Sequence, residues 1–212
     1  MEVARPVPFE EFRLLIPTRG APENVTVRIG LLRAVNVGGI VLRMDALRAL
    51  LLQMGFQDVR TLLQSGNVVF RGPSGPDDTL ERKVEARIAR DLHVTTDVFL
   101  RRPEEWATVV AQNPFPQEAK TMPGYLVVLA LKGSPPKERW DDLRATIPGP
   151  ERVHGIGRHA YVVYPNGQGR SRFTAVWIEK RLGTRVTARN WNTVTKLADI
   201  AAEAEKAGLE SP

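Results

Sequence analysis

One segment of the chain, YPNGQGRSR at residues 164–172, combines groups that suit the binding of an anion. It places two glycines and two arginines between the expected end of a strand and the expected start of a helix. Backbone N–H groups in such a loop can point at a phosphate or carboxylate, and the positive end of the helix dipole adds to the attraction. The candidate ligand-binding residues here are Asn166, Gly167, Gly169, Arg170, Ser171 and Arg172.

The same segment also fits an ordinary turn without a ligand. Asn166 and the two glycines suit turn geometry, and Ser171 can cap the helix that follows. The segment lacks the G-x-x-x-x-G-K-[ST] of a P-loop, and its N-G-x-G spacing differs from the dinucleotide-binding fingerprint. The sequence therefore predicts either an anion site or a tight connection at this point.

A second cluster lies where a short expected strand leads into the last helix. Trp191 could stack on a planar ligand, Arg189 could meet its charge, and Asn190 and Asn192 could select its hydrogen-bonding edge. Lys196 follows Asn192 by four residues and so lies on nearly the same helical face. Under the structural alternative, one of the asparagines caps the helix and the tryptophan is wedged between two subdomains.

A third set of polar residues follows the first expected strand and forms the tip of an expected hairpin. Residues at strand ends often form sites on a rigid scaffold, although turns explain the same residue types. No adjacent histidine or lysine in the sequence marks the hairpin serine as an activated nucleophile. These further candidates are Arg33, Asn36, Gln64, Ser65 and Asn67.

The residue types limit the chemistry. The chain has no cysteine, which removes disulfides, thiolate zinc ligands and thiol nucleophiles together. Its histidines, at positions 93, 154 and 159, lack the H-x-x-x-H spacing of a metal site. We therefore expect no metal, and the sequence identifies neither a cofactor nor a reaction.

The positive charge is concentrated in the C-terminal part of the chain. The net charge is +6, and the segment 157–196 holds eight basic residues against one acidic residue. Such a segment suits a polyanionic partner, either a nucleic acid or a phosphate-bearing small molecule. The alternative is a general abundance of arginine on solvated surfaces.

Hydrophobic periodicity predicts two similar α+β units. The run 25–33 alternates as a strand does, whereas Met44, Leu47, Leu51 and Met54 recur at helical spacing. The first unit then continues with a hairpin over 58–72, a helix over 80–92 and a strand over 95–101. The second unit is expected to have strands at 125–132, near 152, at 160–164 and at 185–188, with helices at 135–146 and 171–183.

The expected order is β-α-β-β-α-β in each unit, the ferredoxin-like arrangement of two helices on a four-stranded antiparallel sheet. The fold class is therefore α+β, with two tandem ferredoxin-like subdomains and a C-terminal helix that ends at Gly208. The expected divisions are an N-terminal extension 1–24, a first subdomain 25–102, a connecting helix and loop 103–123, a second subdomain 124–188 and a C-terminal helix 189–212.

Neither a signal peptide nor a membrane-spanning run is expected from the sequence. No apolar stretch approaches the roughly 18 residues that a spanning helix needs. The N-terminus lacks a basic start followed by an apolar core. We expect a cytoplasmic protein that does not contact a membrane.

Five motifs, in the same order along the chain, resemble those of the bacterial domain of unknown function 1697 family. The resemblance covers roughly residues 25–202 and implies a compact α+β fold with two subdomains and an uncharacterised role. The motifs are LLRAVNVGG at 31–39, GFQDVRTLLQSGNVVF at 55–70, NPFP at 113–116, YPNGQGRS at 164–171 and ARNWNTVTKLADIA at 188–201.

The chain departs from the pattern of that family near the first loop. Ala34 stands where the family usually has glycine, and Leu62 replaces a tyrosine before the hairpin. Ile40 and Val41 replace a pair that is often polar. If the family has an active site at this loop, the lost polar groups imply reduced or altered chemistry in this member.

The sequence supports three functional hypotheses. The first is a binding protein for a phosphate-bearing ligand, nucleic acid or nucleotide, although no RNP-type run for RNA binding is present. The second is a small-molecule enzyme with a pocket between the subdomains. The third is a structural or partner-binding module. Convergence of Arg170, Arg189 and Asn192 on one pocket would favour a ligand site.

Overall fold

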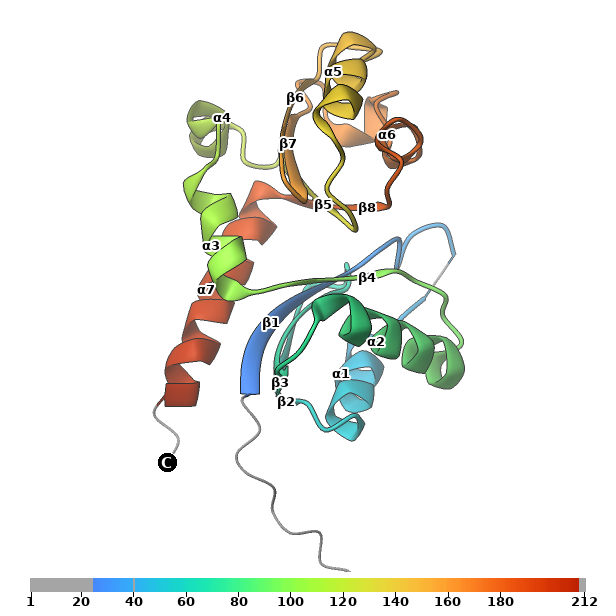
Figure 1. Cartoon of the computed structure of the whole chain (residues 1–212), viewed down its shortest axis with the longest axis vertical. Helices are drawn as coiled ribbons and strands as arrows, with labels where there is room; N and C mark the ends of the chain where they lie inside the picture. The colour runs from blue at the N-terminus through green and yellow to red at the C-terminus, as the bar shows by residue number, and fades with distance from the viewer. Residues whose placement is uncertain (1–24, 40, 210–212) are drawn as a thin grey trace, which may run out of the picture.

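The computed structural model describes residues 25–39 and 41–209, without the side chain of residue 209 (Figure 1). The predicted N-terminal extension 1–24 and Ile40 lie outside the described residues. No helix within the described ranges is both long and apolar enough to cross a bilayer.

The first half of the described chain folds into a four-stranded antiparallel sheet with two helices on one face. Its elements are β1 (Val25–Leu32), α1 (Met44–Gln53), β2 (Gln57–Leu62), β3 (Asn67–Pro73), α2 (Asp77–Leu92) and β4 (Val98–Arg101). The strand order is β2-β3-β1-β4. Leu47 and Leu51 of α1 and Val84 and Ile88 of α2 pack onto this sheet, as their helical spacing predicts.

The second half repeats this plan with shorter helices. Its elements are β5 (Leu126–Leu131), α5 (Lys137–Ala145), β6 (Arg152–Ile156), β7 (His159–Val163), the 3₁₀ turn η1 (Gln168–Arg170), α6 (Ala175–Leu182) and β8 (Val186–Asn190). The strand order is β6-β7-β5-β8, and all strand pairs are antiparallel. The α+β class and the two sheet-and-helix units predicted from the sequence are confirmed.

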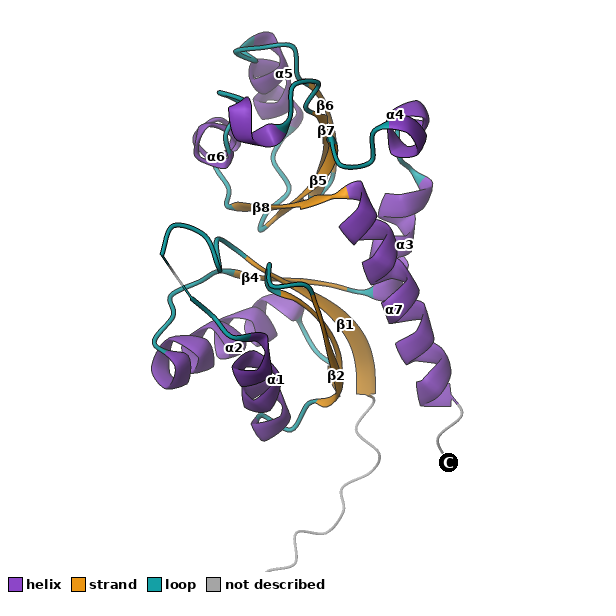
Figure 2. Cartoon of the chain, turned by 180° about the vertical axis from the view of Figure 1, so that it is seen from behind, coloured by secondary structure: helices purple, strands orange, loops and turns teal. Residues whose placement is uncertain are grey.

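Three helices join the two halves. The chain passes between them through α3 (Pro103–Ala111) and α4 (Pro116–Thr121), and α7 (Trp191–Leu209) follows directly after β8. Figures 1 and 2 show α7 running along both sheets beside α3. Trp106 of α3 donates its indole N–H to the carbonyl of Val194 in α7, at 3.0 Å.

The central core lies between the two sheets. Ile29, Leu31 and Phe99 of the first sheet share one apolar cluster with Val128 and Tyr161 of the second. Each sheet is therefore covered on one face by its own helices and on the other by this shared core with α3 and α7.

Three local features differ from the sequence predictions. The last helix continues to Leu209, and Gly208 lies inside its final turn, where a side chain would meet the guanidinium of Arg71. Ser171 does not cap the sixth helix. Thr174 does, accepting a hydrogen bond from the backbone N–H of Trp177. The short helix α4 was not predicted, because six residues are too few to show a periodic pattern.

Candidate functional site

Side chains of the edge strands β4 and β8 cross the contact between the two sheets, and we call this contact the seam (Figure 2). Arg189, on β8, lies in the seam and is 7% exposed. Its guanidinium crosses to the first half, donating hydrogen bonds to the carbonyls of Leu32 at 2.8 Å and Ser65 at 2.9 Å. It also donates to the side chain of Asn67. One arginine of the second half thus ties the hairpin of the first half in place.

Arg189 carries a buried charge that no described carboxylate balances. Besides the partners named above, its guanidinium bonds to the Thr187 hydroxyl at 3.0 Å and to the carbonyls of Ala188 and Gly66. All of these acceptors are neutral. Burial disfavours the charged form and lowers the pKa of Arg189 to about 10, so the group still carries its charge at neutral pH. These bonds engage all five N–H groups of the side chain, so Arg189 can act on an anion through its charge and not through a free donor.

A pocket of about 340 Å³ opens beside Arg189, and we call it the seam pocket. This volume is typical of a site for a small molecule. Both halves of the molecule contribute to it, and most of its wall is aliphatic. The lining residues are Leu32, Arg33, Ala34, Val35, Val37, Ser65, Gln168, Ala175, Val186, Thr187, Ala188 and Arg189.

A second arginine enters the seam pocket as part of an ion-pair group. Arg33 holds Glu179 of α6 with two hydrogen bonds, at 2.9 and 3.1 Å. Arg185 approaches the carboxylates of Glu179 at 3.5 Å and Asp97 at 3.4 Å. Together with Arg189, three guanidinium groups therefore face two carboxylates at this end of the seam. One positive charge is in excess.

The loop after β1 reaches the pocket in an unusual backbone conformation. Ala34 and Asn36 have positive φ values of 54° and 57°. The Asn36 amide fixes the loop by accepting from the N–H of Leu42 at 2.7 Å and by donating to the carbonyls of Leu42 and Gln64. Asparagine tolerates this conformation, whereas alanine is strained in it. The strain at Ala34 lies directly in the pocket wall, where such strain often marks a functional position.

The third set of predicted residues is brought together by the seam. Arg33 and Ser65 line the seam pocket. Asn36 and Asn67 lie behind it, where the fully buried Asn67 donates to Leu62 and to the Ser65 hydroxyl, at 2.9 Å each. Gln64 contributes its backbone carbonyl to the Asn36 contact.

The predicted anion loop at residues 164–172 reaches the pocket only through Gln168. Gly167 has the positive φ, 82°, that the turn requires. Ser171 donates to the carboxylate of Glu151 and accepts from the N–H of Phe173 at 2.9 Å.

The two arginines of this loop do not reach the seam pocket. Arg170 is exposed and has no side-chain hydrogen bond or ion pair among the described residues, and Arg172 donates to the Pro148 carbonyl at 3.3 Å. Asn166 and Gly169 are exposed.

The cluster that begins at Arg189 divides between seam, core and surface. Asn190 accepts from the N–H and hydroxyl of Thr193, both at 3.0 Å, and so serves as the predicted helix cap. Trp191 is 8% exposed and packs in the central core. Asn192 and Lys196 are exposed. Of Arg170, Arg189 and Asn192, only Arg189 lines the seam pocket.

The eight basic residues of the segment 157–196 do not form one free surface. Arg158 pairs with Glu105, Arg181 with Asp142, and Arg185 with Asp97. Within the described residues, no three histidine or acidic side chains come together as a metal site would require.

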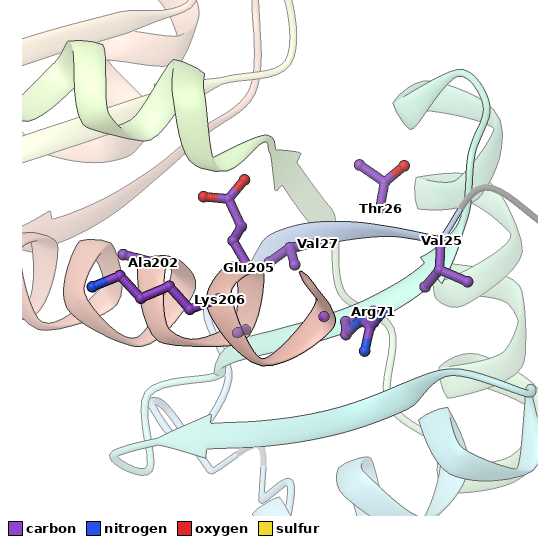
Figure 3. A pocket seen from close by; sticks show the side chains of 9 residues that line it. Val25, Thr26, Val27, Arg71, Ala202, Glu205 and Lys206 are labelled. Atoms are coloured by element: carbon purple, nitrogen blue, oxygen red, sulfur yellow. The ribbon is translucent and has the colours of Figure 1, made fainter. Parts of the chain in front are cut away.

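A larger pocket, of about 550 Å³, lies between the end of α7 and the start of β1 (Figure 3). Figure 3 shows Glu205 and Lys206 leaving the helix in different directions. Burial and the nearby Glu104 raise the pKa of Glu205. The guanidinium of Arg71, which also lines the pocket, packs against Gly208. This pocket holds none of the predicted site residues and no fully buried charge.

Sequence reasoning missed a second buried arginine in the seam. Arg101 of β4 is fully buried and donates to His159 at 2.8 Å and to the Leu131 carbonyl at 2.6 Å. Glu105 lies 3.3 Å from its Nε atom. No local pattern marks Arg101 as a residue of the seam, because its partners from the other half, Leu131 and His159, lie 30 and 58 residues away.

Comparisons with known proteins agree with this fold. A family described as "Protein of unknown function (DUF1697)" matches residues 25–161. A search of curated proteins finds no match. The solved structure of conserved bacterial protein SP0830 from Streptococcus pneumoniae is similar, with a TM-score of 0.64 and 17% identity. That similarity covers 84% of this chain and 99% of the other.

Proposed function

Because this chain belongs to the DUF1697 family of proteins of unknown function, we propose its function from the seam pocket: the binding of a small organic anion. The observation that carries the proposal is Arg189, a buried cation that lines the pocket and has only neutral partners among the described residues. A bound carboxylate or phosphate would supply the missing negative charge.

The charges at the pocket favour a ligand with about one negative charge. The excess of one guanidinium over the carboxylates of Glu179 and Asp97 suits a monoanion better than a polyphosphate. A carboxylate fits this requirement, whereas a phosphomonoester carries about −1.5 to −2 at neutral pH and brings more negative charge than the pocket balances. A phosphate-bearing ligand stays a prediction that the phosphate probes below test. The Gln168 side chain and the Ser65 and Thr187 hydroxyls add polar groups to the wall.

Nucleic acid is a poorer partner for this arrangement. Ferredoxin-like domains that bind RNA stack bases on an open sheet face. The strand orders β2-β3-β1-β4 and β6-β7-β5-β8 support assigning that fold to both halves, with divisions at 25–102, 103–123, 124–188 and 189–212. However, the faces that would stack bases are buried in the central core.

Binding is better supported than catalysis. Ser65 is the lining residue that could serve as a nucleophile, and its Oγ atom accepts a hydrogen bond from the Asn67 amide at 2.9 Å. No described histidine or lysine is hydrogen-bonded to it, so nothing activates it.

A thermal-shift and calorimetric experiment tests the proposal. Phenyl phosphate and benzoate serve as anionic probes, and benzamide is the neutral control of similar shape. We expect both anions to raise the melting temperature, because a ligand that binds only the folded state stabilises it by mass action. Benzamide should leave the melting temperature unchanged.

Variants locate the site. Arg33→Gln should weaken binding of both anions about tenfold or more, because it removes a charge from the wall. Arg170→Ala and Asn192→Ala, at exposed positions outside the seam pocket, should bind as the wild type does. Loss of binding in these two variants alone would move the site to the predicted loop and helix start. Failure of every anion to bind at low salt would overturn the proposal.

A further inference from the structure

We infer that the ligand of the seam pocket is amphiphilic, with an anionic head beside Arg189 and an apolar tail that leaves through the mouth of the pocket. This inference rests on the proposed function and adds the second half of the ligand. It is carried by the aliphatic side chains in and around the pocket.

Three exposed aliphatic side chains lie at or next to the pocket wall, and we call them the apolar rim. Val37 lines the pocket and is 58% exposed. Leu63 is 57% exposed and lies two residues before the lining residue Ser65. Val176 is 70% exposed and directly follows the lining residue Ala175.

The apolar rim is not a chance scatter over one exposed loop. Its members come from the loop after β1, the turn between β2 and β3, and the first turn of α6. They thus belong to both halves of the chain, as the residues that line the pocket do. Single exposed aliphatic residues are normal, whereas a group around a pocket marks a binding surface. The described residues include eight large exposed hydrophobic side chains in all, and three of them are in this group.

The backbone at Leu63 supports the same conclusion. Its φ of 59° is one that a bulky side chain rarely adopts. Glycine or asparagine would relieve the strain in a hairpin turn. The chain instead holds an exposed leucine there, two residues before the lining residue Ser65.

The wall of the pocket connects the charged end to the apolar rim. Leu32, Val35 and Val186 are buried apolar residues of this wall. A ligand that pairs with the excess positive charge in this pocket therefore also contacts aliphatic surface. A carboxylate or phosphomonoester on an alkyl or similar apolar chain has this distribution of groups.

Calorimetric titration with a homologous series tests the inference. The probes are the straight-chain carboxylates from butanoate to octanoate and the alkyl phosphates of the same lengths. We expect the affinity to rise about threefold to fourfold for each methylene that reaches the apolar rim, because each buried methylene contributes a nearly constant free energy. A length dependence in either series supports the inference, and the series that binds more tightly identifies the head group.

The double variant Leu63→Asn and Val176→Asn, at exposed positions outside the pocket lining, should flatten this dependence while short-chain anions bind as before. Leu52→Asn, on the exposed side of α1, is the matched control and should keep the wild-type dependence. Circular dichroism checks that each variant is folded.

The outcomes separate the inference from the proposed function. Binding of the anions with no dependence on chain length would overturn the amphiphilic ligand and leave the anion site intact. No binding at any length and with either head would overturn both. A concentration-dependent dimer that the double variant abolishes would show that a second copy covers the apolar rim, and would also overturn the inference.

Discussion

Arg101 and Arg189 occupy corresponding positions in the two halves of the molecule, yet their surroundings differ. Each is the fourth residue of the last strand of its half, and each crosses the seam to the other half. Arg101 donates to the carbonyl of Leu131, the last residue of β5, at 2.6 Å. Arg189 donates to the carbonyl of Leu32, the last residue of β1, at 2.8 Å.

The partners of the two arginines correspond as well. The Nε atom of Arg101 bonds to His159, the first residue of β7, and that of Arg189 bonds to Asn67, the first residue of β3. Each arginine also bonds to the carbonyl of the residue before it, at 2.7 Å in both cases. The two halves therefore make equivalent contacts with each other through corresponding strand positions. The residue types alone do not show this correspondence.

The acidic residues near the two arginines do not correspond in this way. Near Arg101, the carboxylates of Glu81, Glu85 and Glu105 balance the charges of Arg101, Lys132 and Arg158. Near Arg189, Glu179 occupies the fifth position of its helix as Glu81 does in α2.

The helices α2 and α6 differ at the ninth position counted from their first residue. Glu85 holds it in α2, whereas α6 has ended and Gly183 follows. The charges at the Arg101 end of the seam are thus balanced, with Lys132 between Glu81 and Glu85, and a smaller pocket of about 220 Å³ lies beside His159. The Arg189 end keeps an uncompensated charge beside the larger seam pocket. The duplicated framework holds the halves together at both ends, and α6, with 8 residues against 16 in α2, lacks the part of the helix that carries Glu85.

The largest effect is expected from replacing the two arginines separately with methionine, which has a similar length but no charge. Arg101→Met should lower the free energy of unfolding by about 3 to 5 kcal/mol, because it breaks a buried charged network. Arg189→Met should lower it by about 1 to 3 kcal/mol, because the lost hydrogen bonds are partly offset by removing an unbalanced buried charge. Urea denaturation measures both values.

Equal losses for the two arginine variants would contradict the electrostatic difference between the ends of the seam. Arg170→Met provides the control for the substitution itself, since that side chain is exposed and makes no described side-chain contact. It should change the stability by less than about 0.5 kcal/mol.

A smaller effect is expected at the histidine that distinguishes the Arg101 end. Burial, with Arg101 and Arg158 close by, lowers the pKa of His159 to about 3 from its ordinary 6.5. Between these values the unfolded chain binds a proton that the folded protein does not. The stability contributed by neutral His159 is therefore present above pH 6.5 and is lost as the pH falls towards 3, by a few kcal/mol (order of magnitude).

His159→Asn tests this dependence by introducing the residue type that Asn67 supplies at the other end. Asparagine can accept the same hydrogen bond from Arg101 but does not titrate. The variant should lose less stability than the wild type when urea denaturation is repeated between pH 7 and pH 4. Parallel pH curves for the two proteins would assign the acid sensitivity to other groups.

The elements of the fold were predictable because their signals are local. Alternating and helical periods indicated both units, and the hairpin turn was expected at Gly66, whose φ is 70°. The stacking of the two units was not predictable, because its contacts join distant segments. The hydrogen bond from Arg189 to the Leu32 carbonyl, for example, spans 157 residues of sequence, and no local pattern records it.

The candidate site was predictable only in part for the same reason. Arg189, Arg33 and Ser65 were identified as polar groups near strand ends, and the structure brings these three to one pocket. Their shared position depends on the packing of one half against the other. Glu179 and Arg101 were missed, because a glutamate on an amphipathic helix and an arginine at a strand end are ordinary when viewed alone.

The smallest expected change in the free energy of unfolding comes from replacing Glu85, a carboxylate at the Arg101 end of the seam. Glu85 accepts hydrogen bonds from the N–H of Val98 and from Lys132, both at 2.8 Å. It thereby covers part of the free edge of β4 and balances one charge. Glu85→Ala should lower the free energy of unfolding by about 1 kcal/mol, since the group is partly exposed and Glu81 still holds Lys132.

Glu138→Ala removes an exposed glutamate of α5 that makes no described side-chain contact, and it controls for the general effect of lost negative charge. If both variants lose the same small amount of stability, the neutrality of the Arg101 end is not what closes it. If only Glu85→Ala is destabilised, the extra helical turn that carries Glu85 stabilises this end. The Arg101 end then differs by having two glutamates from its helix, because at the Arg189 end Glu179 alone accepts the corresponding backbone N–H, that of Val186, at 2.9 Å.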